Sequence, residues 1–334
     1  MTFLALFLVA LFRVKTVNMD VLSNVFANQA QSASSYKRLT RFFRGFTIDF
    51  DEIARAVVSW SQIPQPWTLS IDRTNWSLGT LNFNILMLGI VHEGIAFPVM
   101  WTMLDKRGNS NSDERMDLLE RFETLFPDAE VHCLTGDREF VGQAWYSFLL
   151  MPDAMPFRLR LRHSDKISSR SGKTCQKGAR VFANLKQGEQ RILSSKRWVW
   201  GCRVYVVATR LEDGELLILA TNHQPKTALV DYRKRWGIET LFAALKTRGF
   251  KLESTHFCHS ERLSKLVALL AIAFCWAMRT GLWQHQHNPI AIKAHGRRAK
   301  SLFRYGCDFL QRAFSDFSLR RAEFNQALKL LSPY

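Results

Sequence analysis

Three β-rich segments joined by very short connections limit the possible folds more than any other feature of this sequence. They span residues 67–76 (WTLSIDRTNW), 81–91 (LNFNILMLGIV) and 94–104 (GIAFPVMWTML), and the sequences SLGT and HEG connect them. Connections this short fit hairpins between antiparallel neighbours, because a parallel crossover needs about a dozen residues or more. The chain is therefore expected to contain a three-stranded antiparallel unit.

The segments that follow alternate between helical and extended patterns. Residues 111–126 have the pattern of an amphipathic helix and residues 129–137 that of a strand. A second helix begins near Phe140, and residues 155–163 (MPFRLRLRH) form a further strand pattern. The whole order predicts an α/β fold with a mixed sheet and helices on its faces.

Changes in composition divide the chain into four predicted parts. The first part is helical and ends at the Pro-rich sequence QIPQPW, and a later β-rich segment with many Gly and Ser residues interrupts the core. The predicted parts are a helical DNA-binding module (1–62), a core (63–163 and 223–285), a β-rich basic insertion (164–222) and a basic helical tail (286–334).

The charge of the chain indicates a polyanionic partner. Lys and Arg number 46 against 29 Asp and Glu, so the net charge is +17. Residues 151–200 hold twelve of these cations against three acids, and residues 291–334 hold nine against three. Nucleic acid is the first partner that such an excess suggests, although a charged, solvated surface is the plain alternative.

The first part of the chain suggests both a buried helix and a DNA-binding helix. The apolar run at residues 3–12 is too short to cross a bilayer, and its cations follow the run rather than precede it. A buried helix and a cytoplasmic, non-membrane protein are therefore expected. Residues 32–46 (SASSYKRLTRFFRGF) predict a basic helix of a helix-turn-helix type module. Its candidate DNA-binding residues are Lys37, Arg38 and Arg41.

Two tryptophans stand out in the basic insertion. Trp198 and Trp200 lie in residues 151–200, the segment that contains twelve Lys and Arg residues. Trp200 is a candidate for stacking on an unpaired base near a cleaved DNA end. The alternative is that both tryptophans pack in the core, since aromatic residues at alternate strand positions usually do so.

Residues 231–250 (DYRKRWGIETLFAALKTRGF) are interpreted as one amphipathic helix. At about 100° per residue, one narrow face carries a phenol, an acid and two cations. These residues are Tyr232, Arg235, Glu239 and Lys246. The opposite stripe is apolar and is expected to pack on a core; it consists of Val230, Ile238, Leu241 and Leu245.

Three carboxylates occupy informative places in this predicted order. Asp72 follows Leu69 and Ile71 in a strand, which puts it on the face opposite to them. Asp137 follows a Gly at a strand end, and Glu239 lies on the late helix. Three acids from separate elements suit a pair of divalent ions about 3.5–4 Å apart, the arrangement that most favours phosphodiester cleavage.

Glu139 is a competing carboxylate beside Asp137. A salt bridge with Arg138 or a place at a helix N-terminus accounts for Glu139, so Asp137 is preferred as the second metal ligand. Each of the three acids alone also fits an ordinary surface or capping role.

The pattern Y-x2-R-x3-E-x6-K at Tyr232, Arg235, Glu239 and Lys246 resembles the signature of bacterial insertion-sequence transposases with an Asp-Asp-Glu active site. SIDRTNW around Asp72 and LTGDREF around Asp137 are similar to the two aspartate motifs of that family. The basic start KRLTRFFRGF and the spacing of 102 residues from Asp137 to Glu239 are also similar. The resemblance covers residues 20–285 and implies a ribonuclease-H-like core with a β insertion before the glutamate helix.

The resemblance also implies a function. Asp72, Asp137 and Glu239 would hold two Mg²⁺ ions, with Mn²⁺ able to substitute, while Tyr232, Arg235 and Lys246 would grip the DNA backbone. The expected activity is cut-and-paste transposition. The expected partners are terminal inverted repeats and target DNA, bound by a homodimer in a bacterial cytoplasm.

Two other functions compete with this interpretation. An inactive relative retained as a DNA-binding regulator is one, and the presence of all three acids argues against it. A two-carboxylate glycoside hydrolase is the other. The net charge of +17 and the lack of a clear sugar-binding signature disfavour the hydrolase.

Overall fold

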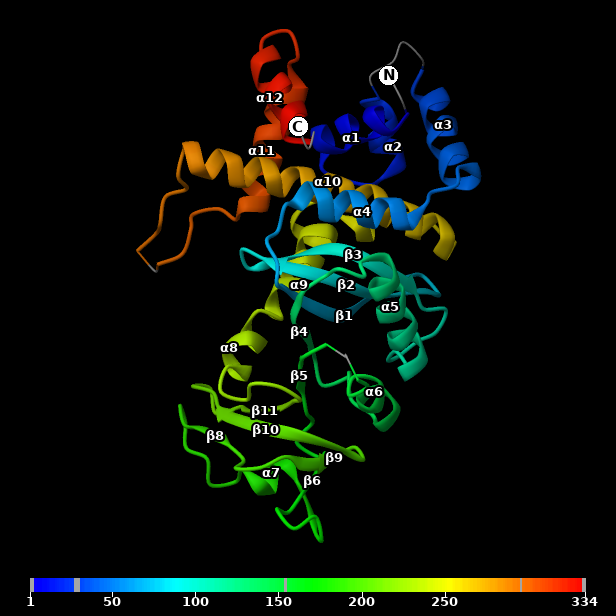
Figure 1. Ribbon diagram of the computed structural model, residues 1–334. Helices are drawn as coiled ribbons and strands as arrows, with labels where there is room; N and C mark the ends of the chain where they lie inside the picture. Colours follow the sequence, from blue (N-terminus) through cyan, green and yellow to red (C-terminus); the bar gives the residue numbers. More distant parts are fainter. Residues whose placement is uncertain (1–2, 27–30, 153–154, 295, 332–334) are drawn as a thin grey trace.

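The computed structural model describes residues 3–26, 31–152, 155–294 and 296–331, and these form three tiers (Figure 1). The antiparallel β unit lies in the middle tier, and the segment predicted as an insertion lies at the lower end. The helical tier at the other end consists of α1 (Phe3–Val14), α2 (Met19–Asn24), α3 (Ser32–Gly45), α4 (Phe50–Ser61), α10 (Ser260–His287), α11 (Leu302–Ser315) and α12 (Arg321–Leu331).

One mixed sheet runs through the middle and lower tiers. Its order is β3 (Ile95–Met103), β2 (Leu81–His92), β1 (Trp67–Leu78), β4 (Val131–Gly136), β5 (Phe157–Arg160), β11 (Leu216–Thr221), β10 (Cys202–Arg210) and β8 (Gln190–Ile192). Strands β1, β2 and β3 are antiparallel, as their short connections predict, whereas β4 and β5 continue parallel to β1. This is the ribonuclease-H-like mixed sheet that was predicted.

The segment predicted as an insertion continues this sheet rather than standing apart from it. Strand β11 pairs antiparallel with β5, and β10 pairs with β11 and β8. A second hairpin arm begins where β9 (Arg197–Val199) turns back onto β10. The remaining elements here are the β6 (Lys166–Ser168) and β7 (Cys175–Lys177) pair and the short α7 (Gly178–Val181).

Helices cover both faces of the sheet because its central strands are apolar on both sides. In β2, Ile85 and Met87 belong to the core beneath α9 (Trp236–Ala243) and α10. Their neighbours Leu86 and Leu88 belong to the opposite core, beneath α5 (Ser112–Leu125) and α6 (Gln143–Phe148). Alternation along a strand sends successive side chains to opposite faces, so one run of apolar residues fills two cores.

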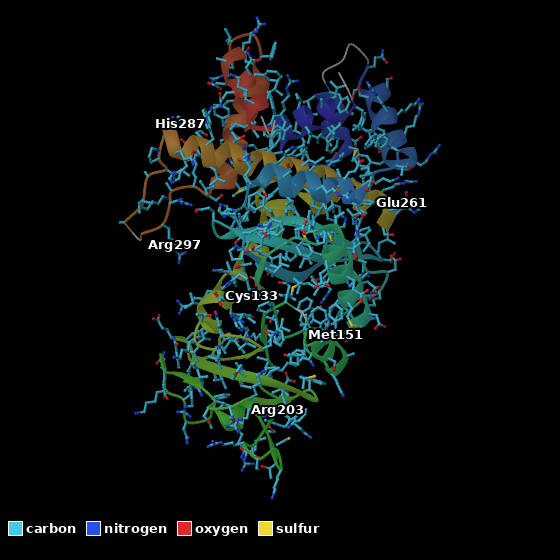
Figure 2. The ribbon with its side chains drawn as sticks, viewed as in Figure 1. Cys133, Met151, Arg203, Glu261, His287 and Arg297 are labelled. Atoms are coloured by element: carbon cyan, nitrogen blue, oxygen red, sulfur yellow. The ribbon has the colours of Figure 1, made fainter. Side chains whose placement is uncertain are left out.

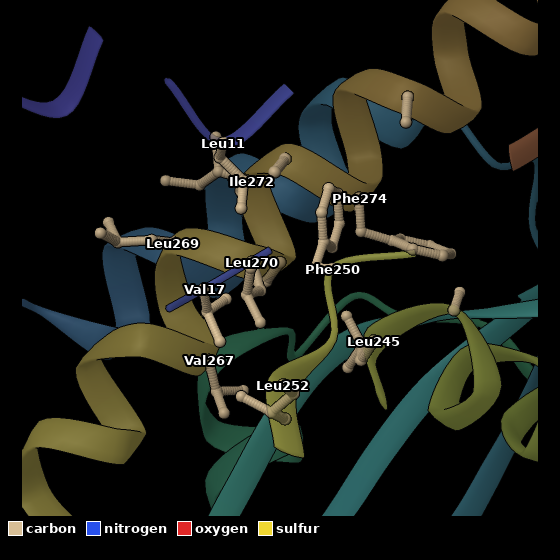
Figure 3. Packing of buried hydrophobic residues seen from close by; sticks show 14 of the residues in the cluster. Leu11, Val17, Leu245, Phe250, Leu252, Val267, Leu269, Leu270, Ile272 and Phe274 are labelled. Atoms are coloured by element: carbon tan, nitrogen blue, oxygen red, sulfur yellow. The ribbon is translucent and has the colours of Figure 1, made fainter. Parts of the chain in front are cut away.

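Helix α10 organises the larger core (Figure 3). Val267, Leu270 and Phe274 of this helix pack toward the segment that carries Leu245 and Phe250. By length and composition α10 could cross a membrane, but 83% of its most apolar window is buried inside the protein. This burial is typical of the central helix of a protein core.

The expected buried helix at residues 3–12 is confirmed as α1. Phe7, Leu11 and Phe12 have no exposed surface, and the Phe12 ring packs against Phe250 and Trp276. The predicted N-terminal module therefore shares one core with α10 and α11.

Candidate active site

Two carboxylates stand side by side where the parallel pairing of β1 and β4 ends. Strands β1 and β4 pair so that Ile71 lies opposite Gly136. The next residues along the two strands are Asp72 and Asp137. Neighbouring strands lie about 4.8 Å apart, and residues level with each other in a parallel pair point to the same face. The fold therefore brings these two predicted site residues together.

Asp72 is largely buried, with a side chain that is 15% exposed. Leu69 and Ile71 point into the core beneath α5, so Asp72 lies on the opposite face, as predicted. Its Oδ1 accepts the Arg73 amide at 2.7 Å, and its Oδ2 accepts Nη1 of Arg235 at 3.2 Å. Burial raises the pKa of Asp72 to about 7, although the Arg73 amide and Arg235 lower it.

Asp137 is partly exposed and begins the turn after β4. Gly136 before it has no room for a side chain, since a Cβ would lie 2.8 Å from the Leu159 Cδ2. Asp137 accepts the Arg138 amide through its own Oδ1 and lines an open hollow of about 630 Å³. The carboxylate is thus fixed at the strand end with surface still available to a ligand.

The interpretation of residues 231–250 as one regular helix was wrong. Helix α8 (Ala228–Arg233) stops before α9, and a π-helical turn, η1 (Ala244–Arg248), follows α9. Between α8 and α9 the amides of Lys234 and Arg235 bond to carbonyls three residues back. This tighter winding rotates α9 about the helix axis relative to α8. A helical wheel at about 100° per residue therefore gives the wrong relative orientation for residues before and after the junction.

The rotation reverses the predicted environment of two residues. Tyr232, predicted on the polar face, is 6% exposed and packs in an apolar cluster with Leu217 and Leu229. Val230, predicted in the buried stripe, is 62% exposed. The other three members of that stripe, Ile238, Leu241 and Leu245, are buried as expected.

Arg235 joins the third carboxylate to the first. Its Nη2 donates to Oε1 of Glu239 at 2.5 Å, while its Nη1 donates to Asp72. The Arg235 side chain is 9% exposed and the Glu239 side chain 36%. Gly237 allows this approach of α9 to the sheet, because a Cβ there would lie 2.8 Å from the Val91 Cγ1. One guanidinium therefore balances two of the three predicted metal ligands.

These residues suit a divalent cation. The acids present hard oxygen donors, which Mg²⁺ and Mn²⁺ prefer. The Arg235 guanidinium lies between Asp72 and Glu239 and forms an ion pair with each of them, so a positive charge at this position interacts favourably with both carboxylates. Asp137 adds a third carboxylate within electrostatic reach of Asp72, since its charge raises the Asp72 pKa.

Lys246 is engaged by the protein itself. Its ammonium donates to the Asn75 carbonyl at 3.0 Å, forms an ion pair with Glu253 at 2.8 Å and lies over the Trp76 ring. Lys246 sits in the π-helical turn, a feature often found at functional sites. It lies beside the part of β1 that follows Asp72.

Glu139 has a structural environment that differs from the predicted one. It pairs with Arg73 at 3.2 Å and accepts the amide and hydroxyl of Ser110. The expected salt bridge with Arg138 is not the contact that forms in the described part of the chain, so that assignment was wrong. Glu139 ties the β1 strand to the start of α5 instead.

The predicted cations of α3 lie on an open surface. Lys37, Arg38 and Arg41 are exposed, whereas Leu39 and Phe43 are fully buried beneath them. A hollow beside the helix is lined by Lys37, Thr40, Arg41, Arg44 and Arg262. Arg262 comes from the distant helix α10, so no local sequence pattern could have placed it in this hollow.

The two tryptophans of the insertion are not core residues. Trp198 is 49% exposed and Trp200 is 39% exposed, which contradicts the packing alternative. The reason is a tight turn after β9, where Trp200 takes a left-handed backbone conformation with φ of 51°. In β9 the neighbours Arg197 and Val199 are buried, which puts Trp198 on the exposed face of the strand.

Another cluster offers metal-ligating atoms away from these acids. His132, Cys133 and Asp231 each offer one atom that can bind a metal. These three atoms lie within 4.8 Å of one another, and they form the cluster of this kind found in the described ranges. Figure 2 shows Cys133 between the middle and lower tiers. The Asp231 carboxylate is already bound by the fully buried Arg158, and burial raises the pKa of the Cys133 thiol to about 12. These contacts describe a buried ion-pair network.

The fold and the site together define a class of enzyme. A ribonuclease-H-like sheet carries two aspartates where the pairing of neighbouring strands ends, and Arg235 links one of them to a glutamate from a late helix. This combination is that of the nucleic-acid enzymes with an Asp-Asp-Glu site. The sequence matches the family described as Transposase DDE domain over residues 65–276, more than half of the chain, and the chain belongs to this family.

Transposases of this family act on DNA and generally use a divalent metal ion. Among solved structures, the chain is similar to the piggyBac transposase synaptic complex with hairpin DNA, determined by cryo-electron microscopy. The identity is 13% and the TM-score 0.43, over 94% of this chain and 67% of that chain. No curated protein matches the sequence.

Proposed function

We propose that this protein is a cut-and-paste transposase of a bacterial insertion sequence, with Asp72, Asp137 and Glu239 as its catalytic residues. The observation that supports this most strongly is the position of Asp72, which is linked to each of the other two acids. Asp72 and Asp137 follow one strand pair, and a single guanidinium links Asp72 to Glu239. Ordinary surface acids rarely share one largely buried guanidinium, as Asp72 and Glu239 do here, beside a third carboxylate on the adjacent strand.

The three carboxylates would hold two Mg²⁺ ions, or Mn²⁺ in their place. When bound, such a pair activates a water molecule and stabilises the leaving oxygen of a phosphodiester. Asp72 must be ionised to serve as a ligand, and its raised pKa favours the acid form until a cation is present. Metal binding therefore has to displace a proton or Arg235 from Asp72.

The DNA chemistry would proceed by strand cleavage followed by strand transfer. Water attacks the phosphodiester at the element's end, and the bond to the 3′ oxygen breaks, leaving a 3′ hydroxyl and a 5′ phosphate. The freed 3′ hydroxyl then attacks the opposite strand to give a hairpin, whose reopening restores that hydroxyl for attack on target DNA. No oxidant or reductant is needed at any step.

Arg235, Lys246 and Tyr232 would grip the backbone of the terminal inverted repeat. In the present structure Arg235 holds Asp72 and Glu239, and Lys246 holds Glu253. In the DNA complex the Arg235 guanidinium would turn from these acids to a phosphate, to which Arg binds through two parallel hydrogen bonds. The buried Tyr232 hydroxyl has no hydrogen-bond partner in the described chain, and it would have to become exposed to donate to a phosphate.

Two further surfaces support the same partner. The exposed cations Lys37, Arg38 and Arg41 of α3 would bind duplex phosphates outside the active site. The exposed Trp200 ring would stack on an unpaired base close to the cleaved end. A homodimer would bring two element ends together, one for each active site.

A nicking assay tests this function. A supercoiled plasmid carrying the DNA that borders the gene is incubated with the protein in Mg²⁺ or in EDTA. The proposal predicts cuts at fixed positions in Mg²⁺ only. Specific binding without cuts would support the regulator instead, and release of reducing sugar from a polysaccharide without DNA cleavage would support the hydrolase.

A further inference from the structure

We infer that a second group of arginines, at the end of β5, just after β5 and in the turn after β4, forms a phosphate-binding site for the DNA strand that enters the catalytic centre. The site is the hollow next to Asp137, with a volume of about 630 Å³. Its arginines are Arg138, Arg160 and Arg162. The inference rests on the proposed function and names three residues outside the Tyr-Arg-Glu-Lys signature.

Strand register places this hollow in line with the acids. Gly136 of β4 lies opposite both Ile71 of β1 and Leu159 of β5, so these three residues form one row across the sheet. The next row is Asp72, Asp137 and Arg160. Residues of one row point to the same face. A cation therefore continues the line of the two aspartates.

Alternation along the sequence FRLRLR extends the cationic surface. Phe157, Leu159 and Leu161 are buried in the core, which leaves Arg160 and Arg162 on the face of the acids. This period of two was visible in the sequence, but its meaning required knowing which strand lies beside β4. The register supplies that neighbour.

The charges in the hollow leave two guanidinium groups available. Glu139 is neutralised by Arg73, and Arg160 pairs with Glu215, the residue before β11. Arg138 and Arg162 are exposed, and neither forms an ion pair with a carboxylate in the described ranges of the chain. The Arg162 Nε donates to the Arg138 carbonyl at 3.1 Å, which holds the Arg162 side chain against the turn.

This arrangement fits a phosphodiester better than an isolated small anion. A planar guanidinium binds two phosphate oxygens at once, and two of them beside a metal-binding carboxylate can hold consecutive phosphates of one strand. A strand whose reacting phosphate lies at Asp137 carries a neighbouring phosphate into this hollow. The positive groups also offset the charge that the strand brings close to the acids.

Salt-dependent DNA binding in EDTA tests the site without involving cleavage. A fluorescein-labelled duplex carrying the DNA that borders the gene is titrated with wild type, with the double variant R138A/R162A and with the control Arg55→Ala. Arg55 is an exposed arginine of α4 outside the hollow. Loss of two phosphate contacts should flatten the log–log salt slope by about 1.8, at about 0.9 for each contact. The control should keep the wild-type slope.

A second test replaces the charged phosphates around the cleavage position of the duplex with neutral methylphosphonate linkages and measures binding again. They should weaken binding by wild type but have much less effect on R138A/R162A, because the charges they would contact are already gone. If the double variant misfolds by circular dichroism, Arg162→Gln alone carries the test, with a slope change of about 0.9.

Three outcomes would overturn the inference. An unchanged salt slope with intact DNA binding would place the arginines outside the DNA path. Equal sensitivity of wild type and variant to the neutral linkages would do the same. Failure of wild type itself to bind the duplex would overturn the proposed transposase function together with this site, and that result is distinguishable from the first two.

Discussion

The buried Asp72 should contribute less stability to the metal-free protein at neutral and alkaline pH than at acidic pH. Its pKa rises from an ordinary 3.8 to about 7, chiefly through burial. A carboxyl with a raised folded-state pKa contributes stability that is fully present below the unfolded pKa. That contribution is lost as pH rises from about 4 to about 7, because the folded form resists ionisation.

The size of the effect follows from the same values. A rise from 3.8 to about 7 is worth about 4 kcal/mol, since one pKa unit corresponds to about 1.4 kcal/mol. The Asp72 side chain is only 15% exposed, so solvent screening reduces this figure little. Asp72→Asn keeps the shape and an oxygen that can accept from Arg235, but it cannot ionise. As the pH rises from about 5 to about 8, the free energy of unfolding of the variant should therefore increase relative to that of wild type by about 2–3 kcal/mol.

Urea unfolding in EDTA at a series of pH values measures this gain. Asn in place of the exposed Asp117 of α5 is the matched control, which should follow wild type throughout. Adding Mg²⁺ at about pH 8 should stabilise wild type and leave Asp72→Asn unchanged, because only the ionised carboxylate binds the ion. An Asp72→Asn variant that tracked wild type at every pH would refute the reasoning from burial.

Three further predictions concern DNA. Glu239→Gln removes a negative charge beside the DNA. The affinity for end DNA without metal should therefore stay the same or rise, while Mg²⁺-dependent cleavage should be lost. Weaker binding in EDTA would contradict this role. Trp200→Ala should slow formation of hairpinned ends at least several-fold without weakening duplex binding, and an unchanged rate in a gel assay would exclude stacking there. Lys37→Ala with Arg41→Ala should weaken duplex binding and flatten its log–log salt slope by about 1.8. An unchanged slope would remove α3 from the DNA-binding surface.

Much of the fold was predictable because local patterns determine it. The connections SLGT and HEG specify the β1–β2–β3 hairpins, and alternation around Ile71 fixes the face of Asp72. The position of Asp137 follows from the strand end at Gly136. These features depend on nearest neighbours in sequence, where steric and hydrophobic rules act directly.

Other features depend on tertiary contacts that no local pattern contains. The prediction of one regular helix over residues 231–250 was wrong because the backbone has a 3₁₀-like turn between α8 and α9 and a wider π-helical turn at η1. Tyr232 is consequently buried and Val230 exposed. The pairing of Arg235 with Asp72 joins residues 163 positions apart. The sheet order that puts Arg160 beside Asp137 was likewise not deducible from the pattern of charges alone.

Strand cleavage by four single variants tests the central claim most directly. Asp72→Ala, Asp137→Ala and Glu239→Ala are compared with Glu139→Ala, using end DNA in Mg²⁺, with binding measured in parallel in EDTA. We predict that the first three lose cleavage and keep DNA binding, because each removes a metal ligand and no phosphate contact. Glu139→Ala should still cut, since Glu139 bonds Arg73 and Ser110. Normal cutting by Asp137→Ala together with loss of cutting by Glu139→Ala would contradict the assignment of the site.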